Sequence, residues 1–366
     1  MMQPTTRRTL LATTGALTTG IIAGCLGDSD DGSDDTSPWN EPVSSNIVTW
    51  DDLGDLEGDL TIYSGRTRDQ IDPLFEQLED RYDDFTVSID QDDNDTMVTK
   101  LLEEGETPAD IFYTQDSGAL AVVKDEDILQ PLPSDITEAI DEGRTDPDGD
   151  WMGVSGRVRA IQYNTDQWDD DLPTDIMEYA YDERFQDIIS TRPNSGTFRA
   201  FIIAMMELEG EDATRDWVSA MVNEQNATLY SGGTAQANAV YSGEQPVALG
   251  NQYYAGRILT EDPDAPLDVA FTENDAGCLF NVSGIGITND TNNASLAAEF
   301  ARHLVAKEGQ EFFVEVNGEY PVIDGVDYVG DLPTVEEINP PDFDLNQLGL
   351  ELEAAVDLLR EEGMRV

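Results

Sequence analysis

The stretch Leu60-Thr61-Ile62-Tyr63-Ser64-Gly65 is the clearest indication of the fold in this chain. Four residues of strand character end there at a Ser-Gly turn. Residues 69–81 follow with apolar side chains at helical spacing, and residues 85–89 alternate as a second strand. A strand, helix and strand in that order predict a parallel sheet with helices packed on it.

The same alternation continues, with a helix expected over 97–104, a strand over 109–113 and a helix over 117–124. Two polar turns, 64–67 and 114–116, follow directly on strands. Ligands of open α/β sheets bind beyond the carboxyl ends of the strands, so these turns predict one polar, convergent rim.

The second half of the chain repeats this organisation. We expect strands at 158–163, 246–249 and 283–288, and helices at 198–208, 214–222, 235–241, from 251, 296–305 and 344–362. A chain of 366 residues with 39% hydrophobic composition is long enough for two domains with a core in each.

The charge balance is extreme. Asp and Glu total 77 against 19 Lys and Arg, which gives a formal net charge of −58. Such a surface repels nucleic acid and anionic membranes, and it also repels itself at low salt. The Debye length falls to about 3 Å at 1 M salt, so the composition indicates adaptation to molar salt. Disorder is the alternative for acidic chains, but the periodic apolar segments argue against it for the body of this one.

The N-terminus has the features of an export signal. Arg7 and Arg8 precede a mildly apolar run over 10–23, which is too short and too polar to span a bilayer. Small residues then lead to Cys25, as in a lipobox, so residues 1–24 are expected to be a twin-arginine signal and Cys25 a lipidation site; a structural free cysteine is the alternative. The acidic stretch 25–57 is expected to be a flexible tether. This places the protein outside the cell, held to the outer face of the membrane only by its lipid.

Several segments together resemble the ferric-ion-binding proteins of ABC importers, of the type II periplasmic binding protein family, here in the form of a haloarchaeal-type lipoprotein. The similar segments are 60–66, 107–113, 129–133, 155–159, 163–165, 195–198, 251–254, 276–277, 319–322 and 358–363. They run in order along nearly the whole mature chain.

The resemblance implies an α/β fold of two lobes. Each lobe is a mixed sheet flanked by helices, the lobes are joined by crossing hinge strands, and the ligand lies in the cleft between them. It implies a first lobe of residues 58–157 plus about 270–325, and a second of about 158–269 plus 326–366. The function implied is a solute-binding component, expected to be a monomer, that delivers a small inorganic ligand to an ABC permease and its ATPase.

The resemblance also implies the ligand residues. Tyr253 and Tyr254 match a tyrosine pair that supplies phenolates to Fe(III). A nearby cation favours the charged form of a tyrosine, whose ordinary pKa is about 10. Without the resemblance, adjacent tyrosines would be interpreted as packing residues.

The turn Ser195-Gly196-Thr197 matches one that holds a synergistic anion such as carbonate or phosphate. Hydroxyls and backbone N–H groups at a helix N-terminus suit an anion, although the same residues also make an ordinary N-cap. Arg157 and Asn251 are expected in the same cleft. Arg157 could hold the anion with two hydrogen bonds, or form a salt bridge between the lobes.

Two positions depart from the family pattern. The usual histidine is Thr67 here, and the usual glutamate is Gln115, beside Asp116. These losses keep open a second interpretation, in which the same cleft binds another small anion or an organic solute. The single histidine, His303, is expected to be a packing or surface residue.

An enzyme is not expected. The sequence contains no nucleophile elbow, no HExxH motif and no Cys-His pair, and one histidine leaves little room for histidine-dependent catalysis.

Overall fold

The computed structural model describes residues 47–141, 143–328 and 332–366. The signal (1–24), Cys25 and most of the predicted tether lie outside these residues. Within the described ranges, no helix has both the length and the apolar character needed to cross a membrane.

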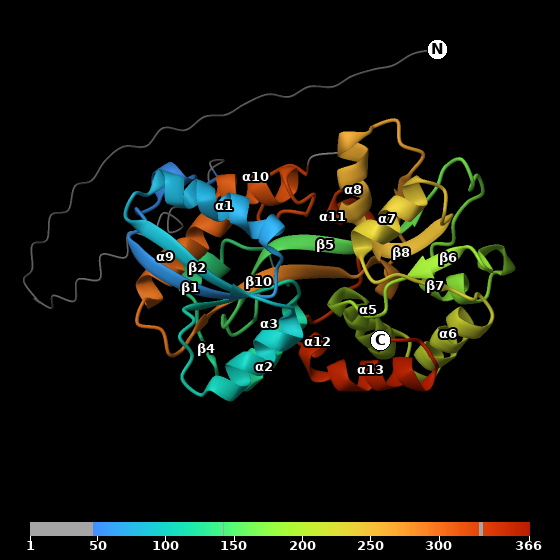
Figure 1. Cartoon of the computed structure of the whole chain (residues 1–366), viewed down its shortest axis with the longest axis horizontal. Coiled ribbons are helices and arrows are strands. Elements are labelled where there is room, and N and C mark those ends of the chain that lie inside the picture. Colours follow the sequence, from blue (N-terminus) through green and yellow to red (C-terminus); the bar gives the residue numbers. More distant parts are fainter. Residues whose placement is uncertain (1–46, 142, 329–331) are drawn as a thin grey trace, which may run out of the picture. The chain divides into compact units, whose positions relative to one another are not determined.

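The described chain is built on one ten-stranded mixed sheet flanked by helices (Figure 1). The strands are β1 (Gly58–Ser64), β2 (Phe85–Gln91), β3 (Ile111–Thr114), β4 (Leu129–Gln130), β5 (Met152–Tyr163), β6 (Ile189–Thr191), β7 (Thr228–Leu229), β8 (Val247–Asn251), β9 (Asp268–Ala270) and β10 (Phe280–Thr288). The helices are α1 (Arg68–Arg81), α2 (Asn94–Glu104), α3 (Ser117–Asp125), α4 (Ser134–Thr137), α5 (Gly196–Leu208), α6 (Glu211–Asn223), α7 (Gly233–Tyr241), α8 (Gln252–Glu261), α9 (Ala294–Val305), α10 (Lys307–Glu315), α11 (Val335–Ile338), α12 (Gln347–Leu350) and α13 (Leu352–Glu361).

The sheet falls into two groups of strands joined by β5. Its order is β2-β1-β3-β10-β5-β8-β6-β7, with β4 on β10 and β9 on β5. The first half of β5 pairs antiparallel with β10 as far as Val158, and the second half pairs with β8 from Arg159 onward. We call β1–β4 and β10 with α1–α4, α9 and α10 the first lobe, and β6–β9 with α5–α8 the second lobe. The predicted mixed α/β organisation is confirmed, while the residue boundaries of the lobes stay a prediction.

Both faces of β5 are buried, which explains its composition. Every residue from Met152 to Gln162 is buried, and the strand shows no simple alternation of polar and apolar residues. A strand that is covered on both faces lacks the polar–apolar alternation that marks a half-exposed strand in a sequence. The sequence therefore predicts only the second half of β5, residues 158–163.

A buried ion pair ties three segments together at the crossing. Arg66, just after β1, donates from Nη2 to Glu319 Oε2 at 2.9 Å and from Nη1 to Ser155 Oγ of β5 at 3.1 Å. Both charged side chains have no exposed area. Tyr320, the residue after Glu319, exchanges backbone hydrogen bonds with Gly156 of β5. The pair therefore joins the end of β1 and the segment after α10 to the crossing strand.

The start of the described chain corrects the predicted tether. Trp50 is buried, its indole N–H donates to the His303 carbonyl at 2.9 Å, and Leu56 is fully buried. Residues 47–57 are thus held on the first lobe, because the apolar side chains of Trp50 and Leu56 are buried in it. Trp50 is hydrogen-bonded to His303 of α9 and Glu308 of α10. His303 is buried, with its ring 2.8 Å from the Tyr82 hydroxyl, so its expected packing role is confirmed.

The C-terminal helix expected over 344–362 is two helices. In Figure 1, α12 and α13 follow one another beneath other helices, α12 packing on α3 and α13 on α5 and α6. Gly349 makes the α12 contact possible, since an added Cβ would stand 2.9 Å from the Gly118 carbonyl. This segment contacts first one lobe and then the other. The helix is interrupted at Glu351, whose φ and ψ are −109° and 14°.

Glu319→Ala should lower the free energy of unfolding by about 3–5 kcal/mol, because it leaves the Arg66 charge buried without a partner. Denaturant titration of tryptophan fluorescence in molar salt measures this change. The double variant Arg66→Met with Glu319→Leu should recover most of the loss. The solvent-exposed pair of Arg215 with Glu361 is the matched control, and Arg215→Gln should change far less. A Glu319→Ala protein as stable as the parent would contradict a structural role for the buried pair.

Candidate ligand-binding cleft

A polar cleft of about 530 Å³ lies between the two lobes. The first lobe contributes the turn after β1, the start of α2 and the turn after β3. The second lobe contributes the turn before α5 and the start of α8. The two turns of the first lobe are the polar rim that the strand pattern predicts, at the carboxyl ends of β1 and β3.

Tyr253 and Tyr254 occupy the first turn of α8 and both line this cleft. Their ring centroids are 4.2 Å apart, and Arg192 donates from Nη1 to the Tyr254 hydroxyl at 3.0 Å. Gly233 lets α7 approach, because a Cβ there would stand 2.2 Å from Cζ of Tyr254. The two phenols are therefore held side by side at the cleft surface.

The surroundings of Tyr253 favour its protonated phenol, because they raise its pKa. Its side chain is 2% exposed. Burial raises its pKa well above the ordinary value, the neighbouring Tyr254 raises it further, and Arg157 acts in the opposite direction. A metal cation next to the oxygen would favour the phenolate and displace the proton.

A small pocket opens beside the N-terminus of α5, next to the cleft. Ser195 is the N-cap, and its Oγ accepts from the backbone N–H of Phe198 at 3.1 Å. Its Oγ is also 3.3 Å from the Thr197 hydroxyl, to which Asn251 donates at 3.4 Å. Ser195 therefore caps the helix and still faces this pocket. The structure brings together Ser195, Thr197 and Asn251, as the sequence predicts.

The pocket also contains two arginines that the sequence analysis missed, Arg159 and Arg192. Arg159 is 6% exposed, and none of the salt bridges between described residues includes it. Its guanidinium carbon lies 4.5 Å from the centre of the Phe201 ring. Burial and the nearby Arg192 lower the pKa of Arg159 to about 9. A positive charge buried among aromatic rings is what an oxyanion would neutralise.

Arg157, which the sequence predicts in the anion site, lies deeper. It is 1% exposed on β5 and donates from Nη2 to the Val282 carbonyl at 3.2 Å, and its Nε and Nη1 have no partner. Arg157 does not line the small pocket, whereas Arg159 does. The two side chains share a face of β5, because they are two residues apart. Arg159 is the one beside the pocket, since β5 pairs it with Asn251 of β8.

The first lobe supplies the carboxylates that line the cleft, those of Asp69, Asp93, Asp95 and Asp116. Thr67 is the N-cap of α1, and its hydroxyl donates to Gln70 Oε1 at 3.0 Å. Asp116 caps α3 through Oδ1 and accepts from Asn94 Nδ2 at 2.6 Å through Oδ2. Thr67, Gln115 and Asp116 all line the cleft, but only Asp116 has a carboxylate, and both of its oxygens already accept hydrogen bonds.

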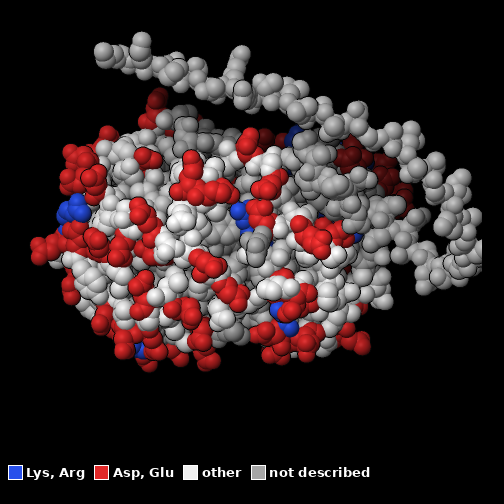
Figure 2. All heavy atoms as spheres, turned by 180° about the vertical axis from the view of Figure 1, so that it is seen from behind, with Lys and Arg blue, Asp and Glu red and all other residues white. Residues whose placement is uncertain are grey.

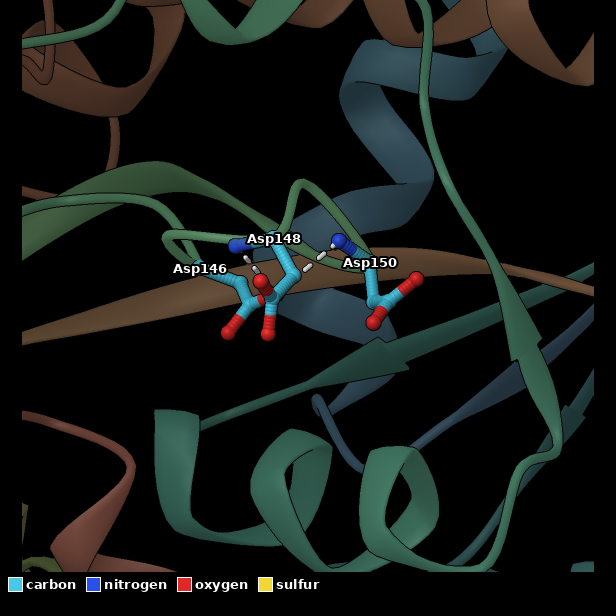
Figure 3. Close-up of side chains that lie close together, drawn as sticks. All are labelled: Asp146, Asp148 and Asp150. Carbon is cyan, nitrogen blue, oxygen red and sulfur yellow. Dashed lines mark hydrogen bonds between the residues drawn. The ribbon is translucent and has the colours of Figure 1, made fainter.

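A loop with three aspartates, Asp146, Asp148 and Asp150, lies outside the cleft. Figure 3 shows the carboxylate of Asp146 accepting from the backbone N–H groups of the other two, at 3.1 Å each. The ammonium of Lys124 lies 2.6 Å from Asp146 and 3.1 Å from Asp148. This lysine already supplies the positive charge, so the loop is a structural turn.

Comparisons with known proteins show the family and the fold of the chain. Residues 106–345 match the family described as bacterial extracellular solute-binding protein. Iron uptake protein A1 of Synechocystis is 30% identical over 74% of this chain and 78% of its own length. Iron-bound HitA from Pseudomonas aeruginosa superposes with a TM-score of 0.77 at 26% identity, covering 83% of this chain and 99% of HitA.

A Trichodesmium protein in complex with iron and citrate has a TM-score of 0.71 at 26% identity, covering 84% of this chain and all of that one. The two-lobed periplasmic binding protein fold is thereby confirmed. The chain belongs to the bacterial extracellular solute-binding proteins.

Proposed function

We propose that the protein captures ferric ion outside the cell and passes it to an ABC permease and its ATPase. The observation that carries the proposal is the pair of phenols, Tyr253 and Tyr254, which line the cleft beside the small pocket at the start of α5. Ferric ion is a small, hard cation that prefers anionic oxygen, which two phenolates supply. The likeness to Iron uptake protein A1 and to iron-bound HitA supports the same ligand.

Two phenolates leave most of the coordination sphere of the metal to other groups. The family's histidine and glutamate are Thr67 and Gln115 here, and the oxygens of Asp116 accept hydrogen bonds from the first lobe. We propose that a small oxyanion, carbonate or phosphate, supplies further oxygens from the pocket at the start of α5. Ser195, Gly196, Thr197 and Asn251 would hold it, and Arg159 with Arg192 would neutralise its charge.

The cellular setting is part of the proposal. The N-terminal sequence supports export by the twin-arginine route and a lipid at Cys25 that holds the protein on the outer face of the membrane. We expect the body to be a monomer. Adaptation to molar salt follows from the acidic surface. Figure 2 shows Asp and Glu spread over one face, with Lys and Arg at a few scattered points.

A second candidate is an oxyanion or small organic solute bound without metal. The unpaired Arg159 and the missing first-lobe ligands favour it. The two candidates differ in what the tyrosines do, because only the metal requires their phenolates.

Tyr254→Phe should weaken the visible tyrosinate-to-iron absorption band, because only the Tyr253 phenolate remains. It should also weaken ferric-ion binding by about 100-fold or more, since even groups that only orient a ligand cost 10–100-fold. The measurement is an absorption titration with ferric ion in molar salt, with and without carbonate or phosphate. Tyr181→Phe, which alters an exposed tyrosine, is the matched control. A band of unchanged intensity in Tyr254→Phe would contradict the proposal, and no band in the parent with any anion would favour the metal-free candidate.

Ferric-ion affinity should fall as the pH is lowered. The pKa of Tyr253 is raised in the ligand-free protein, so the metal must displace a proton that becomes harder to remove in acid. Competition against a chelator of known pH dependence measures this across pH 5 to 8, at one fixed salt concentration. An affinity that stays constant over this range would mean that no phenol loses a proton on binding.

Arg159→Gln should remove the contribution of the oxyanion. Carbonate or phosphate should strengthen ferric-ion binding in the parent and do so about 10–100-fold less in the variant. The affinity measured without added anion should change little. Arg159→Lys, which keeps the charge, should recover part of the effect, and Arg184→Gln, at an exposed ion pair, is the control. An unaltered response to the anion would place the anion elsewhere.

A further inference from the structure

Among the described residues, one ion pair connects the two lobes across the cleft. Arg199, in the first turns of α5, donates from Nη1 to Asp95 Oδ2, in the first turn of α2, at 2.8 Å. Arg199 belongs to the second lobe and Asp95 to the first, and both side chains line the cleft. The Arg199 side chain is 18% exposed, so its stem is largely covered while its charge reaches the partner lobe.

A second contact at the same place brings a first-lobe side chain against the backbone of α5. If Gly196 carried a Cβ, that atom would stand 2.6 Å from Asp116 Oδ2 and 3.9 Å from Arg199 Nη2. The carboxylate of Asp116 thus abuts the first residue of α5. Two first-lobe carboxylates, those of Asp95 and Asp116, therefore meet the positively charged start of α5 and its arginine.

The charge of the whole protein makes this contact significant. The formal net charge is −58, and two acidic lobes that approach one another repel. The cleft is divided by sign. Its carboxylates come from the first lobe, and its three arginines, Arg192, Arg199 and Arg257, come from the second. Opposite charges on facing walls attract as the cleft closes, and Arg199 is the one that pairs across it.

We propose that Asp95 and Arg199 are positioning residues that hold the cleft closed over its ligand. The two residues hold the lobes together and do not contact the metal. They therefore control the rate of ligand release and leave the coordination of the metal unchanged. Closure in itself does not depend on which metal or anion fills the cleft, and only the ferric-ion measurement below rests on the proposed function.

The size of the effect follows from the exposure of the pair. Asp95 is 54% exposed, so water and salt weaken the attraction. Loss of either partner should speed ligand release roughly two- to fivefold, in keeping with measured surface pairs. The effect should be larger at low salt than in molar salt.

The test is a charge-swap cycle in the full-length chain, with Asp95→Arg, Arg199→Asp and the double variant. Release of ferric ion to a competing chelator is followed by stopped-flow absorbance. The distance between the lobes is measured without ligand by electron–electron resonance of spin labels at Glu103→Cys on α2 and Asp212→Cys on α6, in a Cys25→Ser background. Cys278 is fully buried and does not label.

Each single variant should release ferric ion faster and shift the label distances toward longer values. The double variant should return both toward the parent, while the wavelength of the absorption band stays constant throughout. Arg215→Gln, which breaks contacts of α6 with Glu361 and Glu362, is the control and should change neither readout.

Unchanged label distances in both single variants would overturn the proposal, as would a double variant that behaves as the sum of the two singles. If ferric ion fails to bind the parent and the distances still follow the cycle, the pair holds the lobes and the proposed metal function is the part that fails.

Discussion

The arrangement of the cleft depends on buried arginines, whose positive charges need negative partners. Arg66, Arg157 and Arg159 are each at least nine-tenths buried at or beneath it, and Arg66 alone of these three pairs with a carboxylate of a described residue. A buried guanidinium without a counter-ion is costly, so a fold that keeps several must gain from them. Arg66 is matched by Glu319 and fixes the crossing of the lobes. Arg159 faces the pocket at the start of α5, where a bound anion would match it. A buried arginine therefore stabilises the fold at Arg66, and in the proposed function another binds the anion at Arg159.

This division explains how a very acidic protein can hold an anion. The outer surface carries most of its 77 carboxylates, and Figure 2 shows them spread over one whole face. In molar salt their field decays within a few ångströms, whereas charges inside the cleft are screened much less. An anion that reaches the cleft is exposed mainly to the arginines of the second lobe. Under the proposed function, the tyrosine pair adds groups that become negative only when a metal is bound, and the positive metal would attract the anion.

The sequence predicts the fold well where local pattern and tertiary environment agree. Leu60 to Tyr63 alternates and ends at a turn, and it forms β1 as expected. The tyrosine pair and the Ser195 turn are also found at one cleft, as the family resemblance implies. The sequence predicts less well where contacts between residues far apart in the chain determine the local structure. Trp50 lies in an acidic stretch that looks like tether, yet α9 and α10 supply a site for it. The sequence predicts Arg157 at the cleft and does not single out Arg159, which lines the pocket at the start of α5 where β5 pairs with β8. The break at Glu351 follows from α12 and α13 packing on different lobes.

The most direct test of the account is the location of the metal itself. Crystals grown in molar salt with ferric ion and carbonate should give an anomalous difference peak at the iron absorption edge, within bonding distance of the hydroxyl oxygens of Tyr253 and Tyr254. Density for the oxyanion should lie between the start of α5 and Arg159. A peak on the loop of Asp146, or an empty cleft with iron bound elsewhere, would contradict the assignment of this cleft as the ferric-ion site.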